Sequence, residues 1–189
     1  MTVITAEQAL IVLREAELLC SAQAVTAALD RLAAAITARF QERDPLLLVV
    51  MNGGMIPATW LFTRLHFPLQ ISYLHVSRYR GTTHGGKLSW IAKPQLPVAG
   101  RAVLVIDDIY DEGTTLKAIA EYLHAAGAQE VYSAVLVDKL HDRKEPGFTV
   151  DFIGLQVVDR YVFGCGMDYH EYWRNLPAIY AVRETPLSV

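Results

Sequence analysis

The residues best suited to chemistry lie together in one segment, residues 103–119, which reads VLVIDDIYDEGTTLKAI. An apolar run that predicts a buried strand leads into three aspartates, a glycine and two threonines, and a helical pattern then begins. Gly113 permits backbone angles that other residues avoid, and a helix start offers free N–H groups and a positive dipole end to an anion. Thr114 and Thr115 add hydroxyl donors, so this turn predicts a site for a phosphate monoester.

The aspartates of this segment predict a second kind of contact. Asp107 and Asp108 stand at the end of the strand, where they would repel a phosphate if they faced it. They are therefore expected to point at hydroxyl groups or at a divalent cation, for which carboxylate oxygens are good ligands. The structural alternative is that Asp111 and the threonines only cap the helix, while the paired aspartates are solvated loop residues.

The elements that must position this segment follow from hydrophobic periodicity. Apolar residues recur at helical spacing after Ser21, a candidate N-cap, whereas residues 46–54 form a continuous apolar run closed by two glycines, as in a strand buried on both faces. Residues 78–90, RYRGTTHGGKLSW, are polar and glycine-rich without any period, which predicts a mobile loop. The pattern predicts helices over about 6–19, 21–40, 55–66 and 114–127, and strands over about 46–54, 69–76, 101–109, 131–140 and 151–158.

Strands that alternate with helices in this way predict an α/β fold whose central, mostly parallel sheet is flanked by helices. Ligands gather at the carboxyl ends of the strands in such sheets, so the turns after residues 50, 106, 138 and 158 are the expected site. We expect a single domain over residues 1–189. Its core would span about 21–157, with a small hood built from about 158–189 and the N-terminal segment.

Composition narrows the class of function. The 189 residues, 52% of them hydrophobic, can bury one core, and a net charge of -3 with mixed charges gives no basic stripe for nucleic acid. The N-terminus carries acids where a signal peptide carries bases, and no apolar run reaches the ~18 residues of a membrane span, which predicts a cytoplasmic protein. Cys20, Cys165 and the six histidines show no metal-ligand spacing, so no zinc site is expected.

The string VLVIDDIYDEGTTL resembles the phosphoribosyl pyrophosphate (PRPP) signature of the type I phosphoribosyltransferases: four hydrophobics, two acids, a variable pair, Asp, then Gly and Thr. The resemblance extends over roughly residues 45–183 to the hypoxanthine-guanine branch of that family. Three further stretches resemble its pyrophosphate loop, its purine-reading lysine turn and its purine-binding hood: MNGG at 51–54, DKL at 138–140 and VDRYVFGCGMDYHEYWRNLP at 158–177.

The resemblance implies how PRPP would be bound. Asp107 and Asp108 would hold the ribose hydroxyls, directly or through Mg²⁺. Gly53 and Gly54 would let backbone amides approach the pyrophosphate. The residues that would wrap the 5′-phosphate are Asp111, Glu112, Gly113, Thr114 and Thr115.

The resemblance also implies a purine site. Lys139 would contact O6 of the base, Tyr161 would stack on it, and the main-chain carbonyl of Val162 would read the exocyclic amine or the N1 edge. Asp168 would bind a second Mg²⁺, and Arg174 would meet the pyrophosphate. Without the resemblance, the hood aromatics would be interpreted as core residues and Lys139 as a solvated lysine.

The implied activity is purine salvage that depends on Mg²⁺. PRPP and hypoxanthine or guanine would give IMP or GMP and pyrophosphate, with Asp111 as the candidate acid/base partner of purine N7. A homodimer or homotetramer is the expected assembly, and neither nucleic acid nor a membrane is an expected partner.

Three positions depart from the family pattern. Asn52 stands where some members carry a lysine, beside the peptide Met51-Asn52 that is often cis in the family. Glu112 replaces a common threonine, so one side-chain hydroxyl for the phosphate is lost. In the mobile loop the usual Ser-Tyr pair is found as Ser77-Arg78-Tyr79, which leaves the register of the pair open.

Functions from other classes remain open on the sequence. A regulatory protein of the same fold could bind PRPP without turnover, which would call for a basic DNA-facing surface or an extra winged domain. A receiver domain phosphorylated on aspartate also has a strand-end acidic pair, but places it after its first strand and lacks the DEGTT turn. Among enzymes, adenine, xanthine and orotate transferases compete, and the hood favours a 6-oxopurine.

Overall fold

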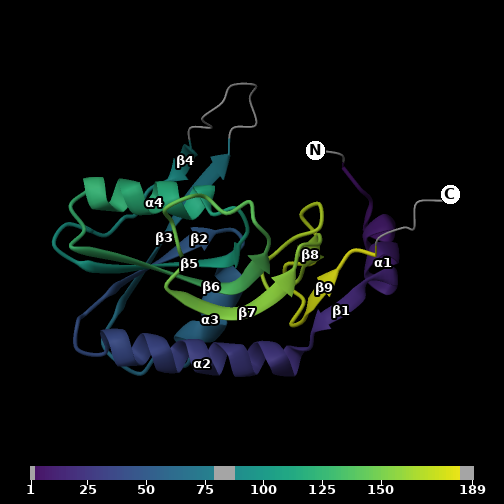
Figure 1. Cartoon of the computed structure of the whole chain (residues 1–189), viewed down its shortest axis with the longest axis horizontal. Coiled ribbons are helices and arrows are strands. Elements are labelled where there is room, and N and C mark those ends of the chain that lie inside the picture. Colours follow the sequence, from purple (N-terminus) through teal and green to yellow (C-terminus); the bar gives the residue numbers. More distant parts are fainter. Residues whose placement is uncertain (1–2, 79–87, 184–189) are drawn as a thin grey trace.

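The computed structural model describes residues 3–78 and 88–183 of the chain (Figure 1). The helices are α1 (Ala6–Glu15), α2 (Ala22–Phe40), α3 (Met55–Phe62) and α4 (Thr114–Ala125). The strands are β1 (Glu17–Cys20), β2 (Leu46–Met51), β3 (Gln70–Arg78), β4 (Leu88–Ala92), β5 (Ala102–Tyr110), β6 (Glu130–Leu140), β7 (Phe152–Val158), β8 (Val162–Phe163) and β9 (Ile179–Ala181).

A six-stranded sheet forms the centre of the molecule, in the order β4-β3-β2-β5-β6-β7. β4 is antiparallel to β3, and the other neighbours in this sheet pair in parallel. Figure 1 shows α2 and α3 on one face of the sheet and α4 on the other, in agreement with the side chains that each helix packs against. The predicted α/β fold with a mostly parallel sheet is confirmed.

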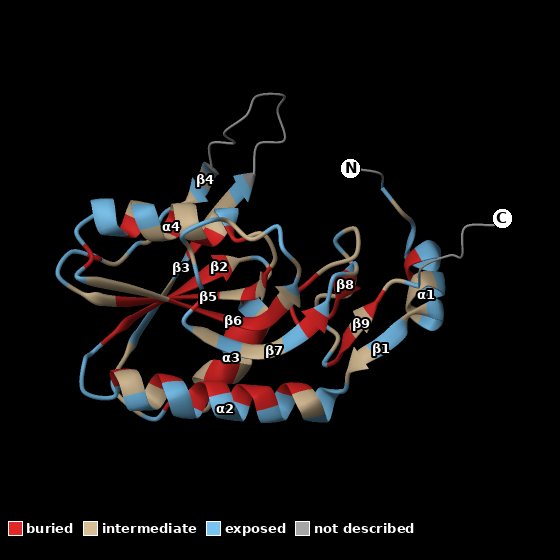
Figure 2. Cartoon of the chain, viewed as in Figure 1, coloured by how far each residue is buried: buried red, intermediate tan, exposed pale blue. Residues whose placement is uncertain are grey.

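The side chains of β2 explain why this sheet needs cover on both faces. Leu47 and Val49 pack with α2 and α3, whereas Leu46, Leu48 and Val50 pack with α4. Successive side chains of a strand point to opposite faces, so a continuous apolar run is stable only when both are covered. Figure 2 shows the buried central strands between the half-exposed helices.

A second, three-stranded antiparallel sheet has the order β1-β9-β8 and joins the two ends of the described chain. The helix predicted over 6–19 is wrong beyond Glu15, because residues 17–20 pair with β9 instead of continuing α1. Pairing between distant segments here overrides a local apolar run. The indole N–H of Trp173 donates to the carbonyl of Ala9 at 3.0 Å and ties α1 to the same region.

Two larger differences from the prediction concern the strands. The strand predicted over 46–54 ends at Met51, where the two glycines form part of a turn. Residues 88–90, the last part of the predicted loop, belong to β4 because this segment adds an antiparallel edge to β3.

Residues 79–87, which include Tyr79 and most of the predicted mobile loop, lie outside the described residues. The backbone of Ser77 and Arg78 belongs to β3 and pairs with β4. In the described ranges, no helix is long and apolar enough to cross a membrane.

Candidate active site

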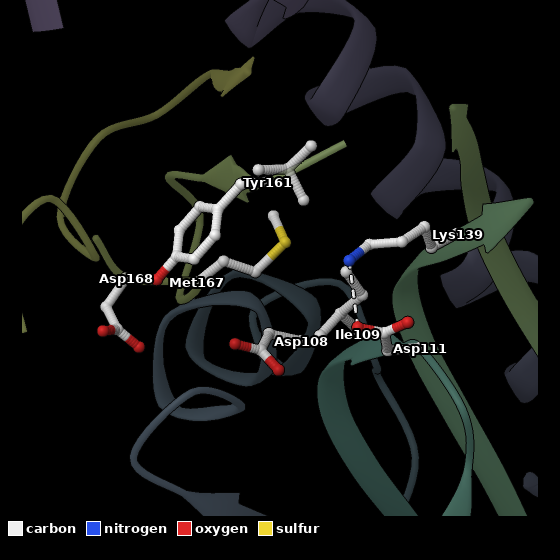
Figure 3. A pocket seen from close by; sticks show the side chains of 8 residues that line it. Asp108, Ile109, Asp111, Lys139, Tyr161, Met167 and Asp168 are labelled. Carbon is white, nitrogen blue, oxygen red and sulfur yellow. Dashed lines mark hydrogen bonds and ion pairs between the residues drawn. The ribbon is translucent and has the colours of Figure 1, made fainter. Parts of the chain in front are cut away.

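A cavity of about 300 Å³ opens at the carboxyl ends of β5 and β6, beside the segment that follows β7 (Figure 3). This is the end of the sheet at which the sequence predicted a ligand site. Residues from three separated segments line it together: Asp108, Ile109, Asp111, Lys139, Tyr161, Val162, Met167 and Asp168.

The acidic pair lies near the end of β5, as predicted. Asp108 is 8% exposed, and its backbone N–H donates to Oδ1 of Asp107 at 2.9 Å. Burial raises the pKa of both carboxyl groups, and the charge of Asp108 raises the pKa of Asp107 further, while Arg174 acts on both in the opposite direction. Hydroxyl donors or a cation at this position would therefore stabilise charges that burial disfavours.

The donor set fits magnesium as a site shared with a ligand. Carboxylate oxygens are hard donors, which is what Mg²⁺ prefers, and Asp168 lies in the same cavity as Asp108. Within residues 3–78 and 88–183, no three His, Cys, Asp or Glu side chains are grouped so that they could hold a metal by themselves. A Mg²⁺ ion here would therefore take much of its coordination from substrate oxygens and water.

The turn after β5 reaches α4 through Gly113, whose φ is 90°. A Cβ on this residue would collide with the ring of Tyr110, so both the backbone angle and the space require glycine. The carbonyl of Glu112 accepts a hydrogen bond from the backbone N–H of Glu145 at 2.7 Å, which holds the turn against the loop after β6. The first N–H groups of a helix have no partner within the helix itself, and a phosphate site uses such groups.

The turn after β2 lies directly against the acidic pair. The Met51-Asn52 peptide is cis, as the resemblance implied. A Cβ on Gly53 would collide with the carboxylate of Asp108, and one on Gly54 would lie 2.7 Å from the carbonyl oxygen of Ile106. Only glycines allow this approach, so the MNGG turn and the end of β5 form one continuous surface.

The hood touches the same turn through Gly166, which the sequence analysis did not select. Its φ is 106°, and a Cβ there would collide with the carbonyl oxygen of Gly53. Arg174 donates to the carbonyl of Gly166 at 2.8 Å and pairs with the carboxylate of Asp168 at 2.7 Å. The two glycines around Cys165 were the available signal, because such spacing indicates unusual backbone angles.

Lys139 and a histidine share the carboxylate of Asp111. Lys139 Nζ donates to Oδ2 at 2.9 Å, as Figure 3 shows, and Nε2 of His141 lies 2.7 Å from Oδ1. Burial acts to raise the pKa of Asp111, but the hydrogen bonds from Lys139 and His141 outweigh it and lower that pKa. Asp111 is thereby held as a carboxylate. His141 is one of the six histidines that lack metal-ligand spacing in the sequence, and its position there did not indicate this contact.

The hood residues divide into a rim and a core. Tyr161 is 52% exposed at the cavity, and its ring meets that of Tyr169 edge-on with 5.5 Å between centroids. A planar base could stack on such a ring. Val162 is buried in β8, and Phe163 is fully buried, so the alternative interpretation as a core aromatic is right for Phe163.

Known proteins share most of this chain. The sequence model of the phosphoribosyl transferase domain family matches residues 17–171. The hypoxanthine-guanine-xanthine phosphoribosyltransferase of Tritrichomonas foetus is 32% identical over 154 residues, which are 82% of this chain and 84% of that protein. The hypoxanthine-guanine phosphoribosyltransferase of Bacillus subtilis (strain 168) is 32% identical over 164 residues, which are 86% of this chain and 91% of that protein.

Solved structures share the fold. A hypoxanthine phosphoribosyltransferase from Staphylococcus aureus superposes with a TM-score of 0.86 at 27% identity, covering 92% of this chain and 95% of its own. A hypoxanthine-guanine phosphoribosyltransferase from Bacillus anthracis has a TM-score of 0.83 at 26% identity, covering 88% of this chain and 98% of its own.

Proposed function

This chain belongs to the phosphoribosyltransferase domain family, and we propose that it transfers the phosphoribosyl group of PRPP to hypoxanthine or guanine. The products are IMP or GMP and pyrophosphate, and the role is purine salvage. We further propose that the chain acts as a single domain, with a core over about 21–157 and a hood, and that it assembles as a homodimer or homotetramer.

One observation carries the proposal. A buried acid at the end of β5, the turn carboxylate Asp111, Lys139 and the exposed ring of Tyr161 line one cavity, although three separate segments supply them. The α4 start lies on the same chain segment as the acids. A phosphate ester, a diol and a planar 6-oxo base thus each have a group suited to bind them at one end of one sheet.

On the PRPP side, the ribose hydroxyls would donate to Asp107 and Asp108. The 5′-phosphate would accept from the N–H groups of the turn at Gly113 and from the hydroxyls of Thr114 and Thr115. Glu112 contributes its backbone to this turn. Its carbonyl already accepts a hydrogen bond from the backbone N–H of Glu145.

On the purine side, the base would stack on Tyr161 with its edge toward the main chain of Val162. Lys139 is bonded to Asp111 in the free protein, so its ammonium would have to turn from Asp111 to reach O6. This exchange of one acceptor for another leaves no buried charge without a partner.

Mg²⁺ would be held by Asp107, Asp108 and Asp168 together with substrate oxygens, and when bound it would neutralise charge on the pyrophosphate. Near that group, Arg174 and the amides at Gly53 and Gly54 would stabilise the negative charge that develops on the leaving oxygens.

In the reaction, the bond from ribose C1 to the pyrophosphate oxygen breaks, and pyrophosphate leaves with the electron pair. N9 of the purine forms the new bond to C1, and the proton on N7 passes to Asp111. The chain supplies no covalent intermediate. Its residues hold the reactants in line, keep Asp111 ionised to accept the proton, and exclude water from the oxocarbenium-like transition state.

The test is pyrophosphate release from PRPP and Mg²⁺ with hypoxanthine, guanine, xanthine, adenine or orotate, or with no base. We expect release with hypoxanthine and guanine, together with IMP or GMP in equal amounts. Tight PRPP binding by calorimetry without release in any of these mixtures would contradict the proposed reaction and would favour a PRPP-sensing regulator. Release with adenine or orotate alone would move the chain to another branch of the family.

A further inference from the structure

His141 is a buried histidine beside the reacting groups that the proposed reaction does not yet use. Its side chain is 3% exposed, and Nε2 lies 2.7 Å from Oδ1 of Asp111. Lys139 occupies the other oxygen, Oδ2, at 2.9 Å. The two carboxylate oxygens therefore have separate partners, which the end of β6 and the residue just after it supply.

The hydrogen bonds of the imidazole define its tautomer. The backbone N–H of Arg143 donates to Nδ1 at 3.1 Å, so Nδ1 is an acceptor. In the neutral ring the proton is then on Nε2, and Nε2 donates to Asp111. Arg143 is itself held by two hydrogen bonds to Asp159, at 2.7 and 2.9 Å. The ring is thus fixed between the turn after β5 and the segment after β7.

We propose that His141 is the positioning residue that holds Asp111 in place during purine transfer, an inference that rests on the proposed function. When Lys139 turns toward O6 of the base, Asp111 loses the donor to Oδ2. Oδ1 remains bonded to His141, so the carboxylate keeps its place while Oδ2 is free to accept the proton of N7. Without His141, the carboxylate would have neither of these two donors once Lys139 had turned away.

Two substitutions separate the effect of the hydrogen-bond donor to Asp111 from the effect of losing the imidazole ring. His141→Gln places an amide N–H near the position of Nε2 and so retains a donor to Asp111. His141→Asn reaches only the position of Nδ1, so it keeps an acceptor for Arg143 but loses the donor to Asp111. Asp142→Asn is the control, because residue 142 is exposed and adjacent in the same turn.

The first measurement is steady-state kinetics with hypoxanthine and guanine. We expect kcat of His141→Asn to fall roughly tenfold to a hundredfold, the range for loss of one hydrogen bond to a charged group. His141→Gln should recover most of kcat, and Asp142→Asn should equal the wild type. KM for PRPP should change by less than about twofold in all three, because neither His141 nor Asp142 is among the residues proposed to contact PRPP.

The second measurement is the pH profile of kcat, which loss of packing alone would not move. His141 is one of the groups that lower the pKa of Asp111, so the acid limb should move to higher pH in His141→Asn and stay in place in His141→Gln. The other charged groups around this ring and carboxylate, Lys139, Asp142, Arg143 and Asp159, are unchanged in both His141 variants.

Wild-type kcat and an unmoved acid limb in His141→Asn would overturn the inference. Equal losses in the Asn and Gln variants, again with an unmoved acid limb, would also overturn it. If the Asn variant does not fold, the Gln variant decides, since a large loss of kcat in it overturns the positioning role and wild-type kcat with an unmoved acid limb supports it. A wild-type protein inactive with every 6-oxopurine would overturn the proposed function itself.

Discussion

The acidic pair at the end of β5 combines two features that oppose each other in the free protein. Burial disfavours the charges of Asp107 and Asp108, and the charge of Asp108 disfavours that of Asp107 further. Yet Asp108 lines the cavity, where the proposed reaction needs hydroxyl acceptors and metal ligands, and Asp107 is its neighbour in β5. Buried carboxylates with a raised pKa are common at functional sites for this reason. The charge of Arg174 offsets only part of the repulsion.

This arrangement predicts the effect of neutralising the pair. Asp107→Asn combined with Asp108→Asn keeps the shape of both side chains but removes the charges, so the protein should fold while turnover falls by more than about 100-fold. Pyrophosphate release across a Mg²⁺ titration is the measurement, with the exposed Asp142→Asn as the control. Wild-type turnover of the double variant at limiting Mg²⁺ would remove the pair from the site.

Lys139 predicts which bases react. An ammonium only donates, so it can pair with O6 of hypoxanthine or guanine but would oppose the amino group of adenine in a desolvated pocket. A site of this kind can favour the paired base over the unpaired one by roughly 10⁴-fold in kcat/KM, so adenine should give near-background turnover. Lys139→Ala should depress the 6-oxopurine reaction far more than the adenine reaction and so narrow their ratio, as measured by kcat/KM for each base.

The prediction for Lys139 has a built-in control, because Lys139 also holds Asp111. A loss that came only through Asp111 would lower kcat for every base by the same factor. An unchanged ratio of hypoxanthine to adenine turnover in Lys139→Ala, or equal use of both bases by the wild type, would therefore contradict a base-reading lysine.

At the residue scale, the sequence predicted what has a distinctive local pattern and missed what depends on distant contacts. The three aspartates and the glycine between residues 107 and 113 stand in one string, which the structure places at the end of β5 and the turn after it, with Asp108 and Asp111 lining the cavity. His141 and Gly166 act through Asp111 and Gly53, which lie far from them in the chain. Neither the type nor the spacing of a single residue encodes such a contact.

At the scale of elements, the contrast between local pattern and distant contact also explains which strands could be predicted from the sequence. β2, β5 and β6 are continuous apolar runs buried on both faces, so hydrophobicity alone indicates them. β1, β8 and β9 have four, two and three residues, and each is a strand only because it pairs with a distant segment. Short strands of this kind carry no period that could be recognised in the sequence.

The role of the turn between β5 and α4 can be tested with a matched pair of glycine variants. Gly113 and Gly100 both have positive φ, 90° and 72°, so an alanine strains the backbone at either position. A Cβ at Gly113 collides with Tyr110, whereas nothing lies within 4 Å of one at Gly100. Gly113→Ala should therefore weaken PRPP binding by roughly tenfold or more through the displaced anion turn, while Gly100→Ala should bind as the wild type.

Calorimetric titration with PRPP and Mg²⁺ compares the two, and thermal melting reports the backbone cost that they share. Unchanged PRPP affinity in a folded Gly113→Ala protein would remove the phosphate assignment from this turn. A comparable loss of affinity in Gly100→Ala would indicate a general effect of destabilisation instead.

At the scale of the whole molecule, ligand binding and folding are linked, because the core and the hood are in contact beside the charged residues of the site. Gly166 of the hood touches Gly53 of the core, and the charge of Arg174 in the hood acts on both Asp107 and Asp108. PRPP with Mg²⁺ would contact both parts at once. A ligand that binds only the folded state stabilises it by about 2.7 kcal/mol at a hundred times its Kd.

The raised pKa of Asp107 predicts how stability changes with pH in the ligand-free protein. The folded state holds this proton more tightly than the unfolded chain, whose carboxyl has a pKa of about 4, so stability is greatest below that value and is lost as pH rises through the raised folded pKa. Asp107→Asn removes the titrating group, so this variant should melt at a higher temperature than the wild type at pH 7 and at a similar temperature near pH 4. In a protein of this size, each kcal/mol of unfolding free energy shifts the melting temperature by about 2–4 °C. Melting curves at the two pH values, with Asp142→Asn as the control, measure the difference.

Saturating PRPP and Mg²⁺ should reverse the order of the two melting temperatures at pH 7, because only the wild type keeps both carboxylates for the ligand and so gains the full binding free energy. A lower melting temperature for ligand-free Asp107→Asn at pH 7, or an equal difference at both pH values, would show that the Asp107 charge is already compensated in the free protein.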